Sequence, residues 1–296
     1  MRLAMFEPKG QPPRLGVLRA HEIVDLAAAA AQSGTPAAYF ASTVQFLEAG
    51  EEARSRAQSL LSAPSTSVAY ALETVRLCAP VPRPGKVIAI GLNYLDHSLE
   101  QGAQLPSAPL VFAKFPTSVT GPYDPIMIPA GDPQVDYEAE LAVIMGRRGK
   151  AVPEAHAMDH VGGYTVLNDV SARKWQFADK QWVRGKSCDT FCPIGPWLTT
   201  RDDVPDPHNL DIATRVNGVT LQSSNTSKLI FRIPQLIAYI SASITLEPGD
   251  IIATGTPEGV GVFRKPPIFL KHGDIVEVEI KGLGTLRNPV RDAAAT

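Results

Sequence analysis

The alternation of apolar and polar positions near the N-terminus predicts a small module of strands and helices. The stretches "RLAMFEP" and "RLGVL" have the composition of short strands and flank a Pro-Pro turn at residues 12–13. Residues 20–34, "AHEIVDLAAAAAQSG", predict a helix that ends at Gly34. Residues 43–63 continue with helical spacing, and their Glu and Arg residues are placed for surface ion pairs.

A proline-rich stretch, "LCAPVPRPGK" at residues 77–86, interrupts this pattern. Beyond it, short apolar runs such as "KVIAIGLN", "ELAVIMG" and "DIIATGT" recur between glycine and proline turn signals. "RIPQLIAYISAS" is the clearest helix there, and "DIVEVEI" alternates as a half-exposed strand does. We therefore predict an α+β, β-dominated chain, with a small α/β domain over residues 1–76 and a strand-rich domain over residues 77–296.

Composition and charge narrow the class of protein. The chain has 44% hydrophobic and 20% charged residues, as ordinary globular proteins do. The net charge of −2 favours neither nucleic acid nor an anionic membrane as partner, and no apolar run reaches the roughly 20 residues that span a bilayer. The N-terminus lacks the apolar core of a signal peptide, and three cysteines cannot all pair. We therefore expect a cytoplasmic protein whose cysteines are buried thiols.

Two glutamates stand in an apolar, strand-forming run, "DYEAELAVIMG" at residues 136–146. The strand period of two places Glu138 and Glu140 on one face, close enough to repel each other. Such a pair is tolerated on a solvent-exposed edge, which is the commoner case, or around a shared hard divalent cation. Asp169 ends another apolar run, "GGYTVLND", and its carboxylate favours the shared cation, although Asp169 also suits a helix N-cap.

The remaining candidates are polar residues in turns or on short predicted helices, namely His97, Glu100, Arg173, Gln176, Lys186 and Thr256. His97 and Glu100 are three residues apart, so the glutamate can orient the imidazole as a general base. Arg173 and Gln176 have the same spacing and are expected to face the same side of a helix. Taken singly, each candidate also has an ordinary interpretation: Lys186, for example, is in a glycine-flanked segment where lysines are usually solvated surface charges.

The order of these segments is more specific than any one of them. From about residue 80 to 290 the chain resembles the fumarylacetoacetate hydrolase superfamily, and the blocks that carry the resemblance are "IGLNYLDHSLE", "VFAKFPTSVTGP", "DYEAELAVIMG", "YTVLNDVSARKWQ", "RGKSCDTFCPIGPWL" and "GDIIATGTPEGVG". The resemblance implies a mixed β-sandwich roll with a small appended N-terminal domain.

The resemblance also implies a metal site for Mg²⁺ or Mn²⁺, which Ca²⁺ could occupy in a crystal. Members that hydrolyse fumarylacetoacetate itself have an aspartate where this chain has Asn93, so the site resembles that of the acylpyruvase-like branch. The implied roles are metal ligation by Glu138, Glu140 and Asp169, catalysis by His97, Glu100 and Lys186, and substrate binding by Arg173, Gln176 and Thr256.

We accordingly predict a metal-dependent hydrolase that cleaves a C–C bond in a β-diketo acid of the acylpyruvate type, with His97 activating water. Oxaloacetate-type decarboxylation and isomerisation or hydration of an oxo-acid are the alternatives on the same site. A non-catalytic metal- or ligand-binding member of the family is a further class, and the intact His97, Glu100 and Lys186 argue against it. The expected partners are a small oxo-acid and, as in most family members, a second copy of the chain in a homodimer.

Overall fold

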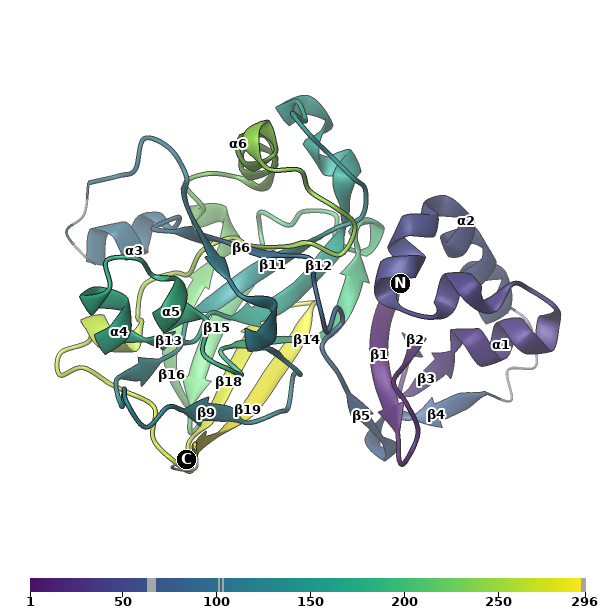
Figure 1. The fold of residues 1–296 in the computed structure, drawn as a ribbon, viewed down its shortest axis with the longest axis horizontal. Helices are drawn as coiled ribbons and strands as arrows, with labels where there is room; N and C mark the ends of the chain where they lie inside the picture. The colour runs from purple at the N-terminus through teal and green to yellow at the C-terminus, as the bar shows by residue number, and fades with distance from the viewer. Residues whose placement is uncertain (63–67, 101, 103, 294–296) are drawn as a thin grey trace.

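Strands dominate the protein. The computed structural model describes residues 1–62, 68–100, 102 and 104–293. Figure 1 shows the N-terminal elements, in purple, beside a larger body that holds most of the strands. The β-dominated, mixed-sheet architecture predicted from the sequence is confirmed.

The N-terminal unit is a small antiparallel sheet covered by two helices. Its elements are β1 (Arg2–Pro8), β2 (Arg14–Arg19), β3 (Glu22–Asp25), α1 (Leu26–Ser33), α2 (Thr43–Ser62), β4 (Ala69–Ala71) and β5 (Val75–Leu77). The predicted strand pair β1–β2 is present and antiparallel. The second predicted helix matches α2, and its last predicted residue, 63, lies outside the described residues.

The helix predicted over residues 20–34 is wrong in its first part. Residues 22–25 form strand β3, because the β-branched Ile23 and Val24 pair with strand β2 and are fully buried. The helix begins only after Asp25, whose Oδ1 accepts a hydrogen bond from the Ala28 N–H at 2.9 Å as an N-cap. It ends at Gly34, as predicted, in the left-handed conformation with φ of 69°.

One large sheet runs through the N-terminal unit and the body. Its strand order is β4-β3-β2-β1-β14-β12-β11-β17-β6-β7, with β5 beside β1 and β8 beside β14. The body strands in it are β6 (Val87–Gly91), β7 (Leu110–Lys114), β8 (Val119–Thr120), β11 (Ala139–Met145), β12 (Val161–Asn168), β14 (Cys192–Thr200) and β17 (Ile251–Ala253). Because β1 pairs with β14, hydrogen bonds of one sheet cross the predicted boundary between residues 76 and 77, which remains a prediction.

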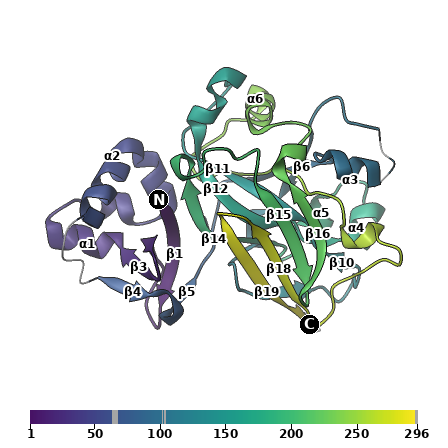
Figure 2. The ribbon, with the colours of Figure 1, turned by 180° about the vertical axis from the view of Figure 1, so that it is seen from behind.

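A second sheet packs against the first and encloses the main core. It consists of β16 (Val219–Asn225), β15 (Asp211–Val216), β18 (Ile275–Ile280), β19 (Gly284–Asp292) and β9 (Ile126–Ile128), and β15, β16, β18 and β19 lie toward the viewer in Figure 2. Leu141, Val166, Val278 and Leu286 belong to the buried apolar cluster that the two sheets share. Strand β18 alternates between buried and partly exposed positions, as its sequence predicts.

Four α-helices and a two-stranded ladder are further elements of the described body, beside several 3₁₀ turns. They are α3 (Leu95–Glu100), α4 (Arg173–Ala178), α5 (Val183–Lys186), α6 (Ile233–Ser243), and β10 (Val135–Asp136) paired with β13 (Ser171–Ala172). Helix α6 is the one that the sequence predicted most clearly. The segments that carry the candidate chemistry are therefore strand ends and short helices around β11.

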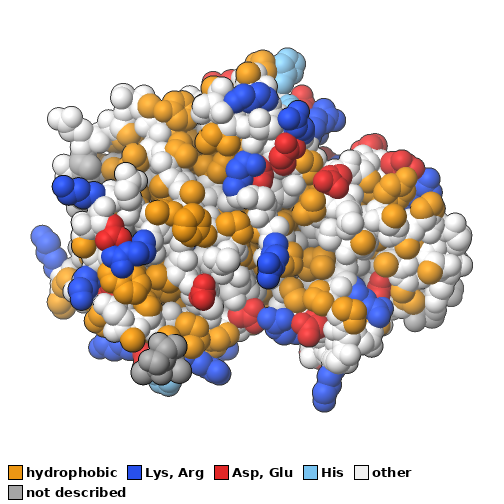
Figure 3. Space-filling model, viewed as in Figure 1, with side chains coloured by type: hydrophobic (Ala, Val, Ile, Leu, Met, Phe, Trp, Pro, Cys, Tyr) orange, Lys and Arg blue, Asp and Glu red, His pale blue; other side chains and the backbone are white. Residues whose placement is uncertain are grey.

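The surface carries charges of both signs (Figure 3), and Cys78 and Cys192 are buried as expected, whereas Cys188 is partly exposed. On the face in Figure 3, Lys and Arg side chains are scattered among acidic and apolar ones. In the described part of the chain, no helix is both long and apolar enough to cross a membrane. Cys78, Cys188 and Cys192 are free, and burial raises the pKa of Cys192 to about 12, which keeps this thiol protonated and unreactive.

Candidate metal centre

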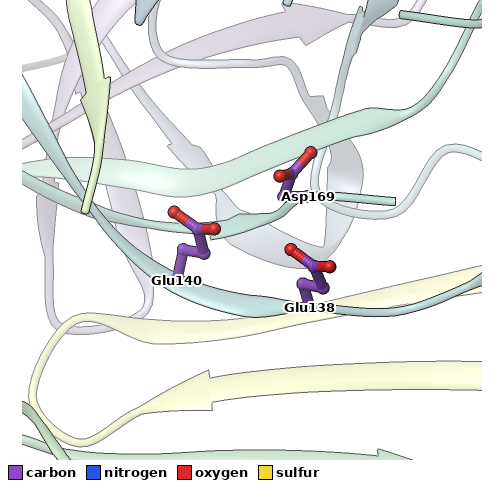
Figure 4. A group of neighbouring side chains, drawn as sticks. All are labelled: Glu138, Glu140 and Asp169. Atoms are coloured by element: carbon purple, nitrogen blue, oxygen red, sulfur yellow. The ribbon is translucent and has the colours of Figure 1, made fainter. Parts of the chain in front are cut away.

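Two neighbouring antiparallel strands bring three carboxylates together. In the β11–β12 register Ala139 lies opposite Asn168, and the next residue, Asp169, donates its N–H to the carbonyl oxygen of Glu138 at 2.9 Å. Glu138, Glu140 and Asp169 each place a carboxylate oxygen within 4.8 Å of the others, and Figure 4 shows the three side chains gathered around one space. Their exposed fractions are 6%, 1% and 0%, so the interpretation as a solvent-exposed edge is wrong.

Asp169 is held by two buried lysines and does not cap helix α4. Its Oδ1 accepts from Lys114 Nζ and its Oδ2 from Lys186 Nζ, both at 2.6 Å. Lys186 also donates to Glu138 Oε2 at 2.8 Å. It ends helix α5 and is 2% exposed, so the interpretation as a solvated surface charge is also wrong. Two positive charges therefore fix the orientation of the Asp169 carboxylate.

Arg173 supplies a third buried cation. Its Nη2 lies 2.6 Å from Glu138 Oε1 and 2.7 Å from Asp136 Oδ1, and its Nη1 donates to Gln176 Oε1 at 2.8 Å. Arg173 and Gln176 thus face the same side of α4, as their spacing predicts. Burial opposes the charged guanidinium, but the carboxylates of Asp136 and Glu138 outweigh it and raise the pKa of Arg173.

Three buried residues at this site were not singled out from the sequence. Asp136 continues the period-two alternation that marks Glu138, so the same signal could have found it. Lys114 ends the apolar strand β7, and a lysine that closes such a run is a weak signal of a buried partner. Gln222 donates from Nε2 to Thr256 Oγ1 at 2.9 Å and accepts a backbone N–H of β11 at 3.0 Å. Nothing local in the sequence marks Gln222, because only the packing of the two sheets brings β16 to this place.

The three carboxylates of the cluster differ in how their charges are compensated. Burial would raise the pKa of Glu138, but the charges of Lys186 and Arg173 lower it to about 2. Burial and then the negative charges of Asp169 and Glu138 raise the pKa of Glu140 well above its ordinary value. Among the described residues Glu140 has no ion-pair partner and accepts a backbone N–H at 2.7 Å. Glu140 is therefore the carboxylate that a bound cation would stabilise most.

The donor set fits a hard divalent cation. Oxygen-only ligands suit Mg²⁺ and Mn²⁺, and no sulfur or imidazole belongs to the described cluster. The buried charged groups of the site are four carboxylates and three cations, namely Asp136, Glu138, Glu140, Asp169, Lys114, Arg173 and Lys186. If all seven groups are ionised, the net charge of the site is −1, and a bound divalent ion would change it to +1. The loaded site would therefore attract an anionic ligand.

Asn93 has a structural role in place of the fourth acidic ligand. Its amide donates to the carbonyl oxygens of Phe231 and Thr254 at 3.0 and 2.8 Å, and its Oδ1 accepts from the Phe231 N–H at 2.8 Å. Both ends of the side chain are thus bonded to backbone. This agrees with a metal site of three carboxylates.

The histidine and glutamate of helix α3 form the expected pair. His97 Nδ1 lies 3.2 Å from Glu100 Oε2, and Glu100 Oε1 accepts the Gly259 N–H at 3.0 Å. His97 lines a cavity of 80 Å³, together with Glu138, Arg173, Gln176 and Lys186. Thr256 is buried against Gln222 and is not among the described residues that line this cavity. Five of the nine predicted site residues therefore line this cavity, whereas Glu100, Glu140, Asp169 and Thr256 are not among its described lining residues.

We expect Glu140→Gln to stabilise the metal-free protein and to abolish its stabilisation by metal. The raised pKa means that the folded protein binds this proton more tightly than the unfolded chain does. The metal-free wild type therefore loses stability as the pH rises above the ordinary value of 4.5, and the glutamine variant lacks this loss. Thermal unfolding between pH 5 and 8, with and without Mn²⁺, measures both effects. A lower melting temperature of the metal-free variant at neutral pH would contradict the electrostatic assignment.

A β-dominated fold with a buried carboxylate triad beside a paired histidine is typical of a class of metal-binding enzymes. The chain belongs to the fumarylacetoacetate hydrolase family: the family profile described as "Fumarylacetoacetate (FAA) hydrolase C-terminal" matches residues 86–291.

Relatives within this family carry different activities in their names. The "Oxaloacetate tautomerase fahd2, mitochondrial" of Xenopus laevis is 48% identical over 295 residues, covering 98% of this chain and 90% of that protein. The maleylpyruvate hydrolase of Sphingobium sp. SYK-6, solved with manganese(II) and pyruvate, has a TM-score of 0.81 at 36% identity and covers 99% of this chain and 100% of that one. A 5-carboxymethyl-2-hydroxymuconate delta-isomerase from Mycobacterium smegmatis has a TM-score of 0.78 at 36% identity, with 100% of both chains covered.

These relatives confirm some predictions and correct others. The family is confirmed, and the neighbour's manganese together with the oxygen donors confirms a divalent metal of the Mg²⁺ or Mn²⁺ kind. The cytoplasmic location is contradicted, because the Xenopus relative is named as mitochondrial. The physical reason for the error is that unpaired cysteines indicate a reducing compartment but do not distinguish one reducing compartment of the cell from another. The homodimer remains a prediction.

Proposed function

We propose that this protein catalyses the keto–enol tautomerisation of a small 2-oxo dicarboxylic acid of the oxaloacetate type. The observation that carries the proposal is one small cavity lined by His97, buried cations and a ligand of the carboxylate triad. The name of the Xenopus relative, 48% identical over nearly the whole chain, favours tautomerisation over the C–C hydrolysis predicted from the sequence.

The buried cations would bind and orient the substrate. Lys186 and Arg173 both line the cavity and are held by ion pairs to Glu138, so their N–H groups are preorganised before a ligand arrives. Gln176 accepts from Arg173 through its Oε1, which leaves its amide N–H groups as donors. A carboxylate and a developing enolate oxygen are the groups that such donors recognise.

Glu138, Glu140 and Asp169 would hold the metal. A bound Mg²⁺ or Mn²⁺ supplies Lewis acidity that stabilises negative charge on a 2-oxo oxygen and acidifies the adjacent C–H group. Lys114 and Lys186 clamp Asp169 from two sides and thereby fix the direction of this ligand.

His97, oriented by Glu100, would move the proton. Tautomerisation removes a proton from carbon and places one on oxygen, so it consumes no water and breaks no bond between carbons. An imidazole can accept the proton as a base and return it as an acid. Because hydrolysis would use the same pair to activate water, the pair by itself does not separate the two reactions.

The test is to give the Mn²⁺-loaded protein freshly dissolved oxaloacetate and to follow its enol absorbance together with the products. We expect rapid conversion between the keto and enol forms with no loss of total oxaloacetate, and no acceleration after chelation of the metal. Stoichiometric formation of pyruvate and carbon dioxide would instead identify a decarboxylase.

Hydrolysis of an acylpyruvate is the second candidate function. The 3.2 Å His97–Glu100 contact is compatible with it, because this geometry also suits activation of a water molecule. The Sphingobium neighbour, which has a similar fold, is named as a maleylpyruvate hydrolase. Release of pyruvate and a free acid from an acylpyruvate, without tautomerisation of oxaloacetate, would favour this candidate.

A further inference from the structure

The cavity beside the metal centre has an aromatic wall that takes no part in the chemistry proposed above. Its described lining includes three aromatic residues, Phe177, Trp182 and Phe263, in addition to charged and amide side chains, and these three are called the aromatic wall. Its volume of 80 Å³ is far below the roughly 300–1,000 Å³ of sites for drug-sized ligands. A separate cavity of 460 Å³ is lined by Glu100 and Arg264, close to this site, and one of 570 Å³ lies elsewhere on the molecule. The site therefore has room for a ligand of few heavy atoms.

Trp182 is held through both its ring and its backbone. Its ring meets the edge of Phe112 at 5.3 Å between centroids with an interplanar angle of 72°. Its carbonyl oxygen accepts the Lys186 N–H at 3.0 Å, and Lys186 Nζ lies 5.3 Å from the Phe112 ring centroid. The tryptophan is thus built into the same short segment that delivers the buried lysine to the cavity.

Gly91 leaves the space that the indole fills. A Cβ atom at this position would lie 2.6 Å from Cζ3 of Trp182, closer than real contacts allow. Gly91 ends strand β6 and also lines the cavity. The close approach of the backbone therefore fixes the indole at the wall.

The other two aromatic residues are less suited to limit the cavity. Phe177 is 56% exposed. Phe263 lies 5.9 Å from the His97 ring, so its position is tied to the proposed base. Trp182 is half-buried and is the largest of the three side chains.

We propose that Trp182 sets the upper limit on the length of the substrate, so that the site accepts short 2-oxo acids and excludes those with extended acyl chains. The proposal rests on the proposed function only for the chemical class of the ligand. An indole held in place cannot move aside for extra methylene groups of a substrate. One methylene group more or less in a hydrophobic pocket changes the discrimination between two substrates by about 10- to 200-fold. The same wall would disfavour long acylpyruvates as substrates.

The test compares the Mn²⁺-loaded wild type with Trp182→Ala, Trp182→Phe and Trp197→Ala. Trp197 is also half-buried but lies on strand β14 and is not among the lining residues, so its variant is the matched control. Calorimetry measures the affinity for pyruvate and for 2-oxooctanoate, which share one head group. We expect the wild type to favour pyruvate and Trp182→Ala to bind 2-oxooctanoate at least about tenfold more tightly than the wild type does. The affinity of Trp182→Phe for 2-oxooctanoate should lie between those of the wild type and Trp182→Ala. Trp197→Ala should keep the wild-type ratio of the two affinities.

An unchanged ratio in Trp182→Ala, or equal binding of both acids by the wild type, would overturn the proposal. If the alanine variant does not fold, the phenylalanine variant decides in the same way, because it removes one ring and keeps an apolar side chain. These affinities do not depend on turnover. Absence of tautomerisation in every variant would therefore count against the proposed function and leave the binding ratio to decide the role of Trp182.

Discussion

Asp169→Asn is expected to abolish both divalent-metal binding and catalysis. The substitution keeps the shape of the side chain but removes the charge that two lysines hold at 2.6 Å each. Loss of the metal removes several kcal/mol of transition-state stabilisation. We therefore expect the rate to fall by a factor of about a thousand. Lys114 also loses its carboxylate partner in a fully buried position, so we expect the variant to unfold more easily, by about 3–5 kcal/mol.

Manganese titration and chemical unfolding of the same samples separate these two effects. Asp250→Asn is the matched control, because Asp250 is also buried and pairs with a lysine, Lys86, at 2.5 Å outside the carboxylate triad. The control should lose stability and keep its manganese affinity. Wild-type metal binding by Asp169→Asn would contradict the assignment of this ligand.

His97→Asn is expected to reduce turnover about 10²- to 10⁴-fold while metal binding survives. His97 shares the cavity with the buried cations, whereas the described carboxylate triad does not include it. The loss should therefore appear in kcat, with substrate and manganese affinities close to those of the wild type. Glu100→Gln should have a smaller effect of the same kind, because Glu100 orients the ring through the 3.2 Å contact.

Steady-state kinetics with oxaloacetate and a manganese titration measure these quantities. His208→Gln is a suitable control, because this half-buried histidine accepts the Ile233 N–H away from the cavity. Wild-type turnover by His97→Asn would contradict the role of His97 as the base. The buried cations would then account for the reaction without it.

Much of the local structure follows from patterns in the chain. Period-two alternation predicts strand β18 and places Glu138 and Glu140 on one face, and an apolar helical run predicts α6. The same reasoning failed at residues 22–25, where a run next to five alanines was assigned to the helix. Pairing with strand β2 outweighs helix propensity there, because it buries the two β-branched side chains.

The sequence by itself determined the family and the kind of metal, from carboxylates at the ends of apolar runs and an order of motifs that marks one family, whereas its prediction of C–C hydrolysis is not confirmed. Only the tertiary structure decided that the carboxylates are buried and which cations compensate them. Lys114 and Gln222 come from strands far along the chain, and the pairing and packing of those strands cannot be read from local periodicity. The size of the cavity was decided in the same way, because Trp182 and Gly91 meet only when helix α5 packs beside the end of strand β6.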